Sequence, residues 1–233
     1  MNEYKLIDKY PAIGQCIPHV KNIVKILREY PDAELEARFG QIKDKTFISG
    51  VSRTTIDEIL NMMKESPYIK VAHDWVEEQD FFYTYNKKQL RTRVKYDSEN
   101  MKTRPHTIEK SNLGTFDASN ISNNSYDIRV SLKREVPINV NDICVNTSLV
   151  RIKQRKRLLT TCKTWAFDFG MVWCGATKTD AELAQSNNDP IFEIECELID
   201  PTKYLSLHDD AYIATSLLLK MIDLIGESKF IPK

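Results

Sequence analysis

The chain reads Phe-Glu-Ile-Glu-Cys-Glu-Leu over residues 192–198, so that three carboxylates alternate with apolar side chains. This period of two is that of a β-strand, and it predicts Glu193, Glu195 and Glu197 on one face. The stretch Glu-Leu-Glu-Ala-Arg-Phe-Gly at residues 34–40 repeats the pattern near the other end of the chain. Carboxylates stacked on neighbouring strands repel one another unless a cation lies between them. The two stretches therefore indicate a cation site.

Composition places the chain among ordinary globular proteins, because 42% of its 233 residues are hydrophobic and 28% are charged. Lys plus Arg equals Asp plus Glu at 33 each, which argues against a general nucleic-acid coat but allows a local basic site. Five cysteines without a CxxC pair indicate reduced thiols and an intracellular location, without a zinc site. The polar N-terminus is unlike a signal peptide, and residues 211–225 are too short an apolar stretch to span a bilayer.

Periodicity predicts a mixture of strands and a few helices. Helices are expected at 19–30, at 52–66 with Ser52 or Thr54 as the cap, and from Asp210 to a stop at Gly226. Strands are expected at 68–76, 79–86, 88–97, 107–110, 126–136, 147–158, 160–173 and 190–200, with a polar loop at 117–125 and a surface excursion, helical around 179–184, at 177–188. We expect one α+β domain over residues 1–233.

The strands carry an unusual density of charge on one face. Arg91, Arg93 and Lys95 alternate with uncharged residues, and similar alternation recurs in 127–135 and 151–155. A closed antiparallel barrel of about eight strands explains this pattern if the charges point inward and the helices pack on the apolar outside, which inverts the usual small barrel. This fold places Asp168 inside. It places the aromatic residues outside, under the helices: Trp75, Phe81, Phe82, Trp165, Phe167 and Phe169.

Two constellations carry chemistry on these strands. Carboxylates without nearby Cys or His suit Mg²⁺ or Mn²⁺, and the run Arg151-Ile-Lys-Gln-Arg155, joined by Arg91 and Lys110, can hold an oligophosphate. The competing interpretation is a solvated sheet face whose glutamates pair with lysines and arginines. The sequence contains no GxSxG, P-loop or HExxH motif that would point to another reaction.

Several ordered motifs resemble the triphosphate tunnel metalloenzymes, and more specifically the metal-dependent RNA 5′-triphosphatases of fungal, protozoan and viral mRNA capping. Residues 34–40 resemble the first glutamate strand of that family and 192–198 its last. The basic run at 151–155 precedes a Trp-x-x-Asp strand, and Ser-Leu-Lys-Arg-Glu-Val-Pro at 131–137 resembles the strand that carries an essential glutamate. Arg38 stands where the thiamine-triphosphatase and adenylyl-cyclase branch has Lys, which favours the capping branch.

The resemblance implies a role for each matching residue. Glu34, Glu36 and Glu197 would ligate Mg²⁺ or Mn²⁺. Glu195 and Glu135 would orient the attacking water, with Glu193 in support. The β and γ phosphates would be held by Arg91, Lys110, Arg151, Lys153 and Arg155.

The implied activity is hydrolysis of the γ-phosphate of triphosphate-ended RNA, the first step of mRNA capping, with nucleoside triphosphates as side substrates. The alternatives are a tunnel enzyme for tripolyphosphate or an organic triphosphate, and a non-catalytic phosphate-binding barrel. The resemblance also suggests an N-terminal domain excised from a giant-virus (mimivirus-like) capping enzyme, in which guanylyltransferase and methyltransferase domains follow. Such a protein is expected in the host cytoplasm, at the virus factory, or in the virion, away from membranes.

Overall fold

The structure, a computed structural model, describes residues 11–96, 105–119, 121, 126–138 and 147–225. Cys144 and the expected helix stop at Gly226 lie outside these residues. None of the described helices is long and apolar enough to cross a membrane.

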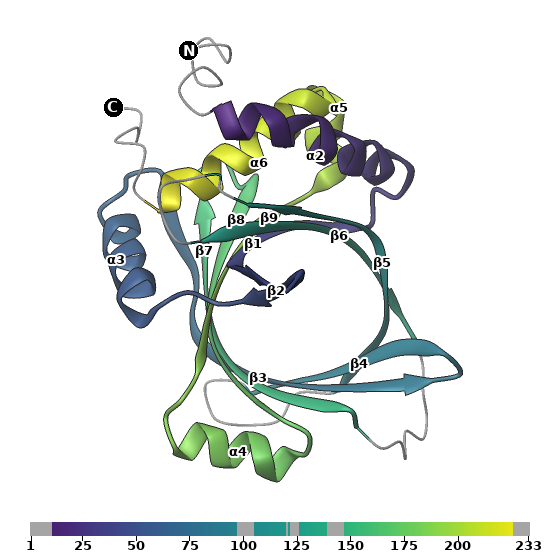
Figure 1. Cartoon of the computed structure of the whole chain (residues 1–233), viewed down its shortest axis with the longest axis vertical. Helices are drawn as coiled ribbons and strands as arrows, with labels where there is room; N and C mark the ends of the chain where they lie inside the picture. The colour runs from purple at the N-terminus through teal and green to yellow at the C-terminus, as the bar shows by residue number, and fades with distance from the viewer. Residues whose placement is uncertain (1–10, 97–104, 120, 122–125, 139–146, 226–233) are drawn as a thin grey trace.

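The strands close into a barrel that Figure 1 shows end-on as a ring. They run in the order β1-β6-β5-β4-β3-β7-β8-β9, every neighbouring pair is antiparallel, and β9 pairs with β1 to close the ring. Strand β2 adds a hairpin to β1. The bounds are β1 (Glu34–Lys43), β2 (Thr46–Ser49), β3 (Ile69–Tyr85), β4 (Lys88–Lys95), β5 (His106–Ala118), β6 (Asp127–Pro137), β7 (Leu149–Thr160), β8 (Trp165–Gly175) and β9 (Ile191–Leu198). The predicted α+β fold with a closed eight-stranded antiparallel barrel is confirmed.

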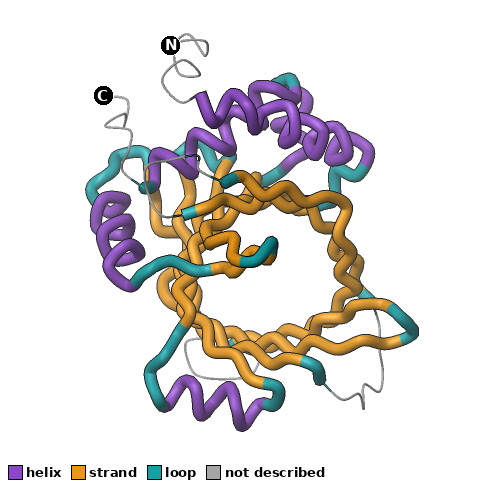
Figure 2. The backbone as a smooth tube through the Cα atoms, viewed as in Figure 1, coloured by secondary structure: helices purple, strands orange, loops and turns teal. Residues whose placement is uncertain are grey.

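The helices lie on the outside of this barrel and leave part of its wall uncovered, as Figure 2 shows. They are α2 (Pro11–Glu29), α3 (Arg53–Lys64), α4 (Lys178–Ser186), α5 (Pro201–Leu207) and α6 (Asp210–Leu224). Ser52 caps α3 as predicted, because its side chain accepts a hydrogen bond from Thr55 N. The cap predicted for α6 is wrong by one residue: Asp209 accepts from Tyr212 N, while Asp210 lies inside the helix and binds Arg28.

The main core lies between the outer barrel face and helices α2, α3, α5 and α6. Period-two alternation turns Trp165, Phe167 and Phe169 of β8 outward into this core, as predicted, and all three are buried. The prediction is wrong for Phe82, whose side chain lines the inside of the barrel. Trp75 lies on the outside beside α3, as predicted, but it is 40% exposed and therefore not packed under the helix.

Several expected segments differ in their bounds from the structure. The helix expected at 19–30 already begins at Pro11, and the strand expected at 107–110 extends from His106 to Ala118. The two strands expected at 68–76 and 79–86 are the single strand β3, whose register against β7 shifts on both sides of His73. Such irregularities add residues to one strand and interrupt its alternation, which made one strand look like two. The strand expected from residue 160 begins at Trp165, because residues 161–164 form a turn in which Lys163 has φ 56°.

Candidate active site

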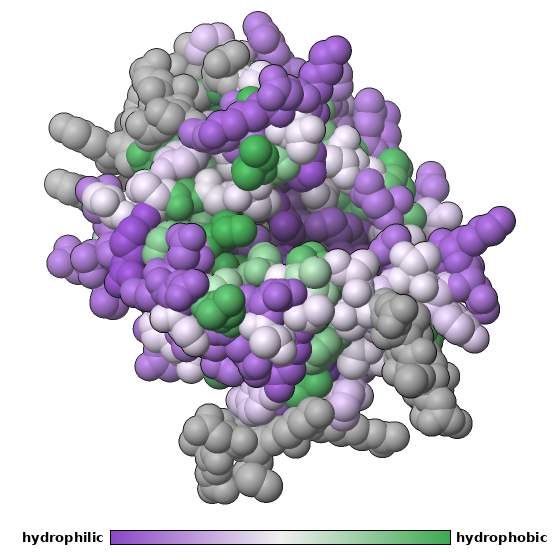
Figure 3. Space-filling model, turned by 60° about the horizontal axis from the view of Figure 1, so that its bottom comes forward, coloured by the Kyte–Doolittle hydropathy of each residue, from purple (hydrophilic) through white to green (hydrophobic). Residues whose placement is uncertain are grey.

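The inward faces of the strands line a cavity of about 320 Å³ inside the barrel. Figure 3 shows strongly hydrophilic residues in the hollow of the molecule. Most of the side chains predicted for the site line this cavity: Glu34, Glu36, Arg91, Lys110, Glu135, Arg151, Lys153, Arg155, Glu195 and Glu197. Glu193 lies beside the lining, 6% exposed, and both of its oxygens accept hydrogen bonds from Arg151 at 2.7 Å. The fold therefore gathers residues that are up to 163 positions apart, from Glu34 to Glu197, in one place.

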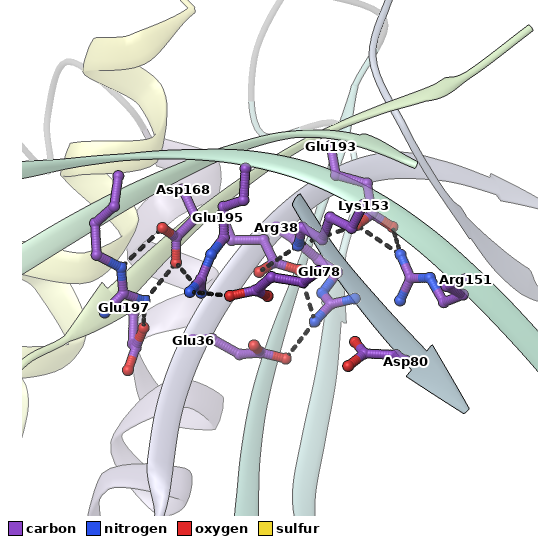
Figure 4. Close-up of polar contacts among 12 residues, drawn as sticks. Glu36, Arg38, Glu78, Asp80, Arg151, Lys153, Asp168, Glu193, Glu195 and Glu197 are labelled. Carbon is purple, nitrogen blue, oxygen red and sulfur yellow. Dashed lines mark hydrogen bonds and ion pairs between the residues drawn. The ribbon is translucent and has the colours of Figure 1, made fainter. Parts of the chain in front are cut away.

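The two glutamate strands are neighbours in the sheet. In the β1–β9 pairing, Glu36 is the partner of Glu197, and Arg38 is the partner of Glu195. The Arg38 guanidinium lies 2.5 Å from Glu36 and 3.1 Å from Glu195, so it bridges two carboxylates from different strands (Figure 4). Lys133 of β6 also donates to Glu36. Arg38 and Lys133 thus neutralise part of the charge of the stacked carboxylates.

The pKa values of these bridged carboxylates follow from their partners. Burial alone would raise the pKa of Glu36, but Arg38 and Lys133 outweigh it and lower that pKa below its ordinary value. For Glu195, Lys153 and Arg38 likewise overcome burial and hold the pKa well below its ordinary value. Both groups are therefore carboxylates at neutral pH.

Glu34 and Glu197 are less well compensated. Among the described residues no cation forms an ion pair with Glu34, and burial followed by the repulsion of Glu135 raises its pKa to about 7. Glu197 accepts from Arg157, yet burial raises its pKa and Asp168 adds to the rise. Repelling carboxylates at the wall of a polar cavity are the environment in which a divalent cation is favourable.

The donor set fits a hard divalent cation, because the candidate ligands are all carboxylate oxygens. Within the described part of the chain, however, no three acidic, His or Cys side chains already converge on one metal position. The reason is visible in the ion pairs: Arg38 and Lys133 hold Glu36, and Arg157 holds Glu197. Glu36 and Glu197 would have to exchange these cations for the metal.

Several arginines of the cavity wall have hydrogen-bond donors without an acceptor. The Nε atoms of Arg38, Arg91 and Arg155 are buried and have no hydrogen-bond acceptor among the described residues. A buried guanidinium donor without a partner is costly, and phosphate oxygens are its natural acceptors. The arrangement is therefore suited to binding an oligophosphate.

Gly170 of β8 makes room for Lys153 in this wall. A Cβ atom at Gly170 would lie 2.8 Å from Lys153 Cε and 3.6 Å from its Nζ. The lysine stem thus lies where a β8 side chain would otherwise be, and its ammonium lies 3.7 Å from Glu193 and 3.8 Å from Glu195.

Sequence reasoning missed part of the ion-pair network. Glu78 is fully buried, and Arg155 and Arg93 contact it at 2.8 and 3.2 Å. Asp80 receives a two-pronged hydrogen bond from Arg93 at 2.6 and 2.7 Å. The available signal was the spacing of two between Glu78 and Asp80, which the adjacent Glu77 obscured. The same spacing from predicted residues would have found two further cations, Lys133 before Glu135 and Arg157 after Arg155.

Asp168 points into the cavity as predicted, and Figure 4 shows it beside Glu195 and Glu197. It accepts both prongs of Arg157, one of them from Nε at 2.8 Å, and lies 3.6 Å from Arg155. Its role is to hold two cations of β7 in place along the cavity wall.

Comparison with known proteins agrees with this geometry. A family described as "mRNA capping enzyme, beta chain" matches residues 48–214, which is most of the chain. No curated protein sequence matches this chain.

Solved structures share the fold. The Pct1 RNA triphosphatase of S. pombe has a TM-score of 0.66 at 17% identity, over 90% of this chain and 93% of that one. The mimivirus capping enzyme triphosphatase has a TM-score of 0.57 at 15% identity, over 89% and 97%. A further structure, of the RNA triphosphatase domain of a trifunctional mimivirus mRNA capping enzyme, has a TM-score of 0.55 at 14% identity, over 89% and 96%. With most of its length matched and its charged barrel in place, this chain belongs to the mRNA capping enzyme β-chain family and is an RNA 5′-triphosphatase, a hydrolase of the first step of mRNA capping.

Proposed function

We propose that this tunnel removes the γ-phosphate of triphosphate-ended RNA with Mg²⁺ or Mn²⁺ held by Glu34, Glu36 and Glu197. The observation that supports this assignment is the meeting, in one cavity, of undercompensated carboxylates with arginines whose Nε donors lack acceptors. A metal satisfies the first group and a triphosphate satisfies the second.

The cations would hold the β and γ phosphates. Arg155 and Arg91 have donors to offer, while Lys153 contributes a point charge beside Glu195. Arg151 is fixed by Glu193, which assigns Glu193 a supporting role. Lys110 lies 2.5 Å from Glu135, so a phosphate that attracts Lys110 would also release Glu135.

The reaction is an in-line attack of water on the γ-phosphorus through a loose transition state, for which positioning and charge neutralisation matter most. The metal, when bound, supplies neutralisation of charge on the phosphate oxygens. Glu195 and Glu135 orient the water. Glu195 is suited to accept hydrogen bonds, because its pKa lies well below its ordinary value and it stays ionised.

Because the charged side chains of the tunnel pair with one another, binding of metal and triphosphate would exchange these ion pairs for contacts to the ligands. Cations of the tunnel pair with its carboxylates, as Arg91 and Lys110 do with Glu135. A triphosphate that recruits these cations leaves carboxylates that a divalent metal can then neutralise. Metal and substrate should therefore strengthen each other's binding.

The test is release of γ-phosphate from triphosphate-ended RNA by the purified chain, with Mg²⁺ or Mn²⁺ and with excess chelator. We expect chelator to abolish release, and Glu34→Gln and Glu197→Gln to lower kcat/KM at least about a hundred-fold. Glu58→Gln, a change of an exposed glutamate on α3, is the matched control and should have no effect. Equal release with and without chelator, or full activity in both tunnel variants, would reject the proposal.

The wider setting is also a proposal. The mimivirus relative is described as trifunctional, which supports guanylyltransferase and methyltransferase domains in the same full-length chain here. Cys16, Cys162, Cys174 and Cys196 are free, which supports an intracellular location; for a viral protein this would be the host cytoplasm or the virion. Nucleoside triphosphates are expected as side substrates, since the tunnel residues described above address the phosphates alone.

A further inference from the structure

The inner wall formed by β3 changes its chemistry toward the hairpin that joins it to β4. Its inward residues are, in order, Glu78, Asp80, Phe82 and Thr84. Glu78 is 0% and Asp80 3% exposed, Phe82 is half-buried, and Thr84 is exposed and accepts from Gln89 Nε2 at 3.1 Å. The wall thus passes from buried charge, through an aromatic ring, to neutral polar groups at the mouth.

Phe82 is the exception in the lining of the cavity. Among the described residues that line it, Phe82 alone is uncharged. The two aromatic neighbours of Phe82 in the chain are held by packing. Tyr83 is buried and hydrogen-bonded to Thr92, and Phe81 packs against a small hydrophobic cluster that contains Val150 and Trp173. The hydrophobic core therefore does not account for Phe82. A half-buried aromatic ring that lines a charged cavity, and is not packed in the core, offers an apolar surface to a ligand.

The position of Phe82 is fixed by its surroundings. Its carbonyl oxygen accepts from Ser148 N at 2.8 Å and from Ser148 Oγ at 3.2 Å. On the neighbouring strand its register partner is Arg91, whose buried Nε has no acceptor among the described residues. The ring therefore lies beside a guanidinium that donates to Glu135 through Nη2 at 2.9 Å and has a further donor, Nε, for a phosphate.

We propose that Phe82 is a specificity-determining residue on which the base of the first nucleoside of the substrate stacks, and that the RNA leaves the tunnel past the β3–β4 hairpin. The inference rests on the proposed function. A triphosphate-ended RNA is an anionic head followed by a neutral nucleoside, and the β3 wall presents charge and then a ring in that order. Every base has a π face, so the platform accepts any first nucleotide.

The experiment compares substrates with and without a base. The wild-type chain and its variants are assayed on triphosphate-ended RNA, on ribose 5′-triphosphate and on inorganic tripolyphosphate, with the same metal. Phe82→Leu keeps apolar volume but removes the ring face, while Phe82→Tyr keeps the ring. Tyr85→Leu is the matched control, because Tyr85 is an exposed aromatic residue of the same strand outside the cavity lining.

The readout is the ratio of kcat/KM on RNA to kcat/KM on tripolyphosphate, which misfolding does not change because it lowers both values together. Phe82→Leu should lower this ratio about ten-fold, as expected for one stacked base. Phe82→Tyr should keep the ratio within about two-fold of wild type, and Tyr85→Leu should leave it unchanged. The ratio of ribose 5′-triphosphate to tripolyphosphate should not respond to Phe82→Leu, since neither carries a base.

The inference is overturned if Phe82→Leu leaves the RNA ratio near its wild-type value, if Tyr85→Leu lowers it equally, or if ribose 5′-triphosphate is affected as strongly as RNA. A wild-type chain that is inactive on every substrate would instead contradict the proposed function, so the two failures are distinguishable.

Discussion

The tunnel and a second, larger cavity lie on opposite faces of the same strand. Outside the barrel, a pocket of about 1030 Å³ is lined by Trp165, Phe167 and Tyr204, whereas the tunnel cavity measures about 320 Å³. Phe167 and Asp168 are adjacent in β8, yet the first faces the pocket and the second the tunnel. The candidate active site is in the smaller cavity. The site is therefore recognised by its uncompensated charges and not by its volume.

The outer pocket and the tunnel also differ in the partners that they offer to a cationic side chain. In the outer pocket, Lys220 lies 5.1 Å from the centre of the Trp165 ring and donates to Ser216 Oγ at 3.1 Å. In the tunnel, Arg155 has a buried Nε without an acceptor among the described residues, although its Nη2 reaches Glu78. The outer face of the barrel thus contributes mainly to stability, and the inner face mainly to ligand binding. The following variants test this division of roles between the two faces.

The largest effect on stability is expected from Phe167→Ala. Phe167 is buried under the helices, so its truncation should cost about 3–5 kcal/mol of unfolding free energy. Chemical denaturation measures this loss, with the smaller change Phe167→Leu as control. Activity per folded molecule should stay within about two-fold of wild type, since the side chain faces away from the tunnel. A loss of activity comparable to that of the tunnel variants, in protein that is still folded, would contradict the separate roles of the two faces.

A smaller effect is expected for Glu34 in metal-free protein. Its folded pKa of about 7 lies above the ordinary value of 4.5, so the folded state binds its proton more tightly than the unfolded state. The stabilisation by this proton is present below pH 4.5 and is lost as pH rises through about 7, a change on the order of 3 kcal/mol. Denaturation in chelator should show Glu34→Gln gaining stability relative to wild type from pH 5 to pH 8. A constant difference across that range would show that Glu34 is not strained by its neighbours.

The smallest effect is expected from Lys220→Met in the outer pocket. Burial lowers the pKa of Lys220 below its ordinary value of 10.5, so the folded state binds this proton more weakly than the unfolded state. Stability of the wild type therefore rises with pH as 10.5 is approached. At pH 7 the variant should be about 1 kcal/mol more stable, and the gain should shrink at alkaline pH. Thermal unfolding at pH 7 and pH 10 measures it, and a destabilised variant would mean that the Trp165 contact outweighs burial.

The sequence predicted most of the site because barrel strands keep strict alternation where they are regular. Glu193, Glu195 and Glu197 of β9 lie on the inward face, as do Arg151, Lys153 and Arg155 of β7, with β8 between the two strands. Alternation within each strand reveals both sets. In β3 the register shifts on both sides of His73, but the strand is regular from Val76 to Phe82. Glu78 and Asp80 were missed because the adjacent Glu77 obscures their spacing of two, and Phe82 was wrongly assigned to the outside together with the other aromatic residues.

Counter-ions were beyond the reach of local spacing for another reason. Arg38 joins Glu36 to Glu195 only because β1 and β9 close the barrel, although 157 positions separate Arg38 from Glu195. The hairpin strand β2 and the seven-residue helix α5 were also not predicted, since segments this short carry too few periods to be recognised.

Gly170 supplies space in the cavity wall that an account of the charges alone does not reveal. The place of its missing methyl group is taken by the end of the Lys153 side chain, whose Cε atom would lie 2.8 Å from a Cβ atom at this position. Alanine would force that side chain into another conformation, so the ammonium group would move although no charge had changed. A single hydrogen atom in place of a methyl group thus decides where a cation lies in the wall of the cavity.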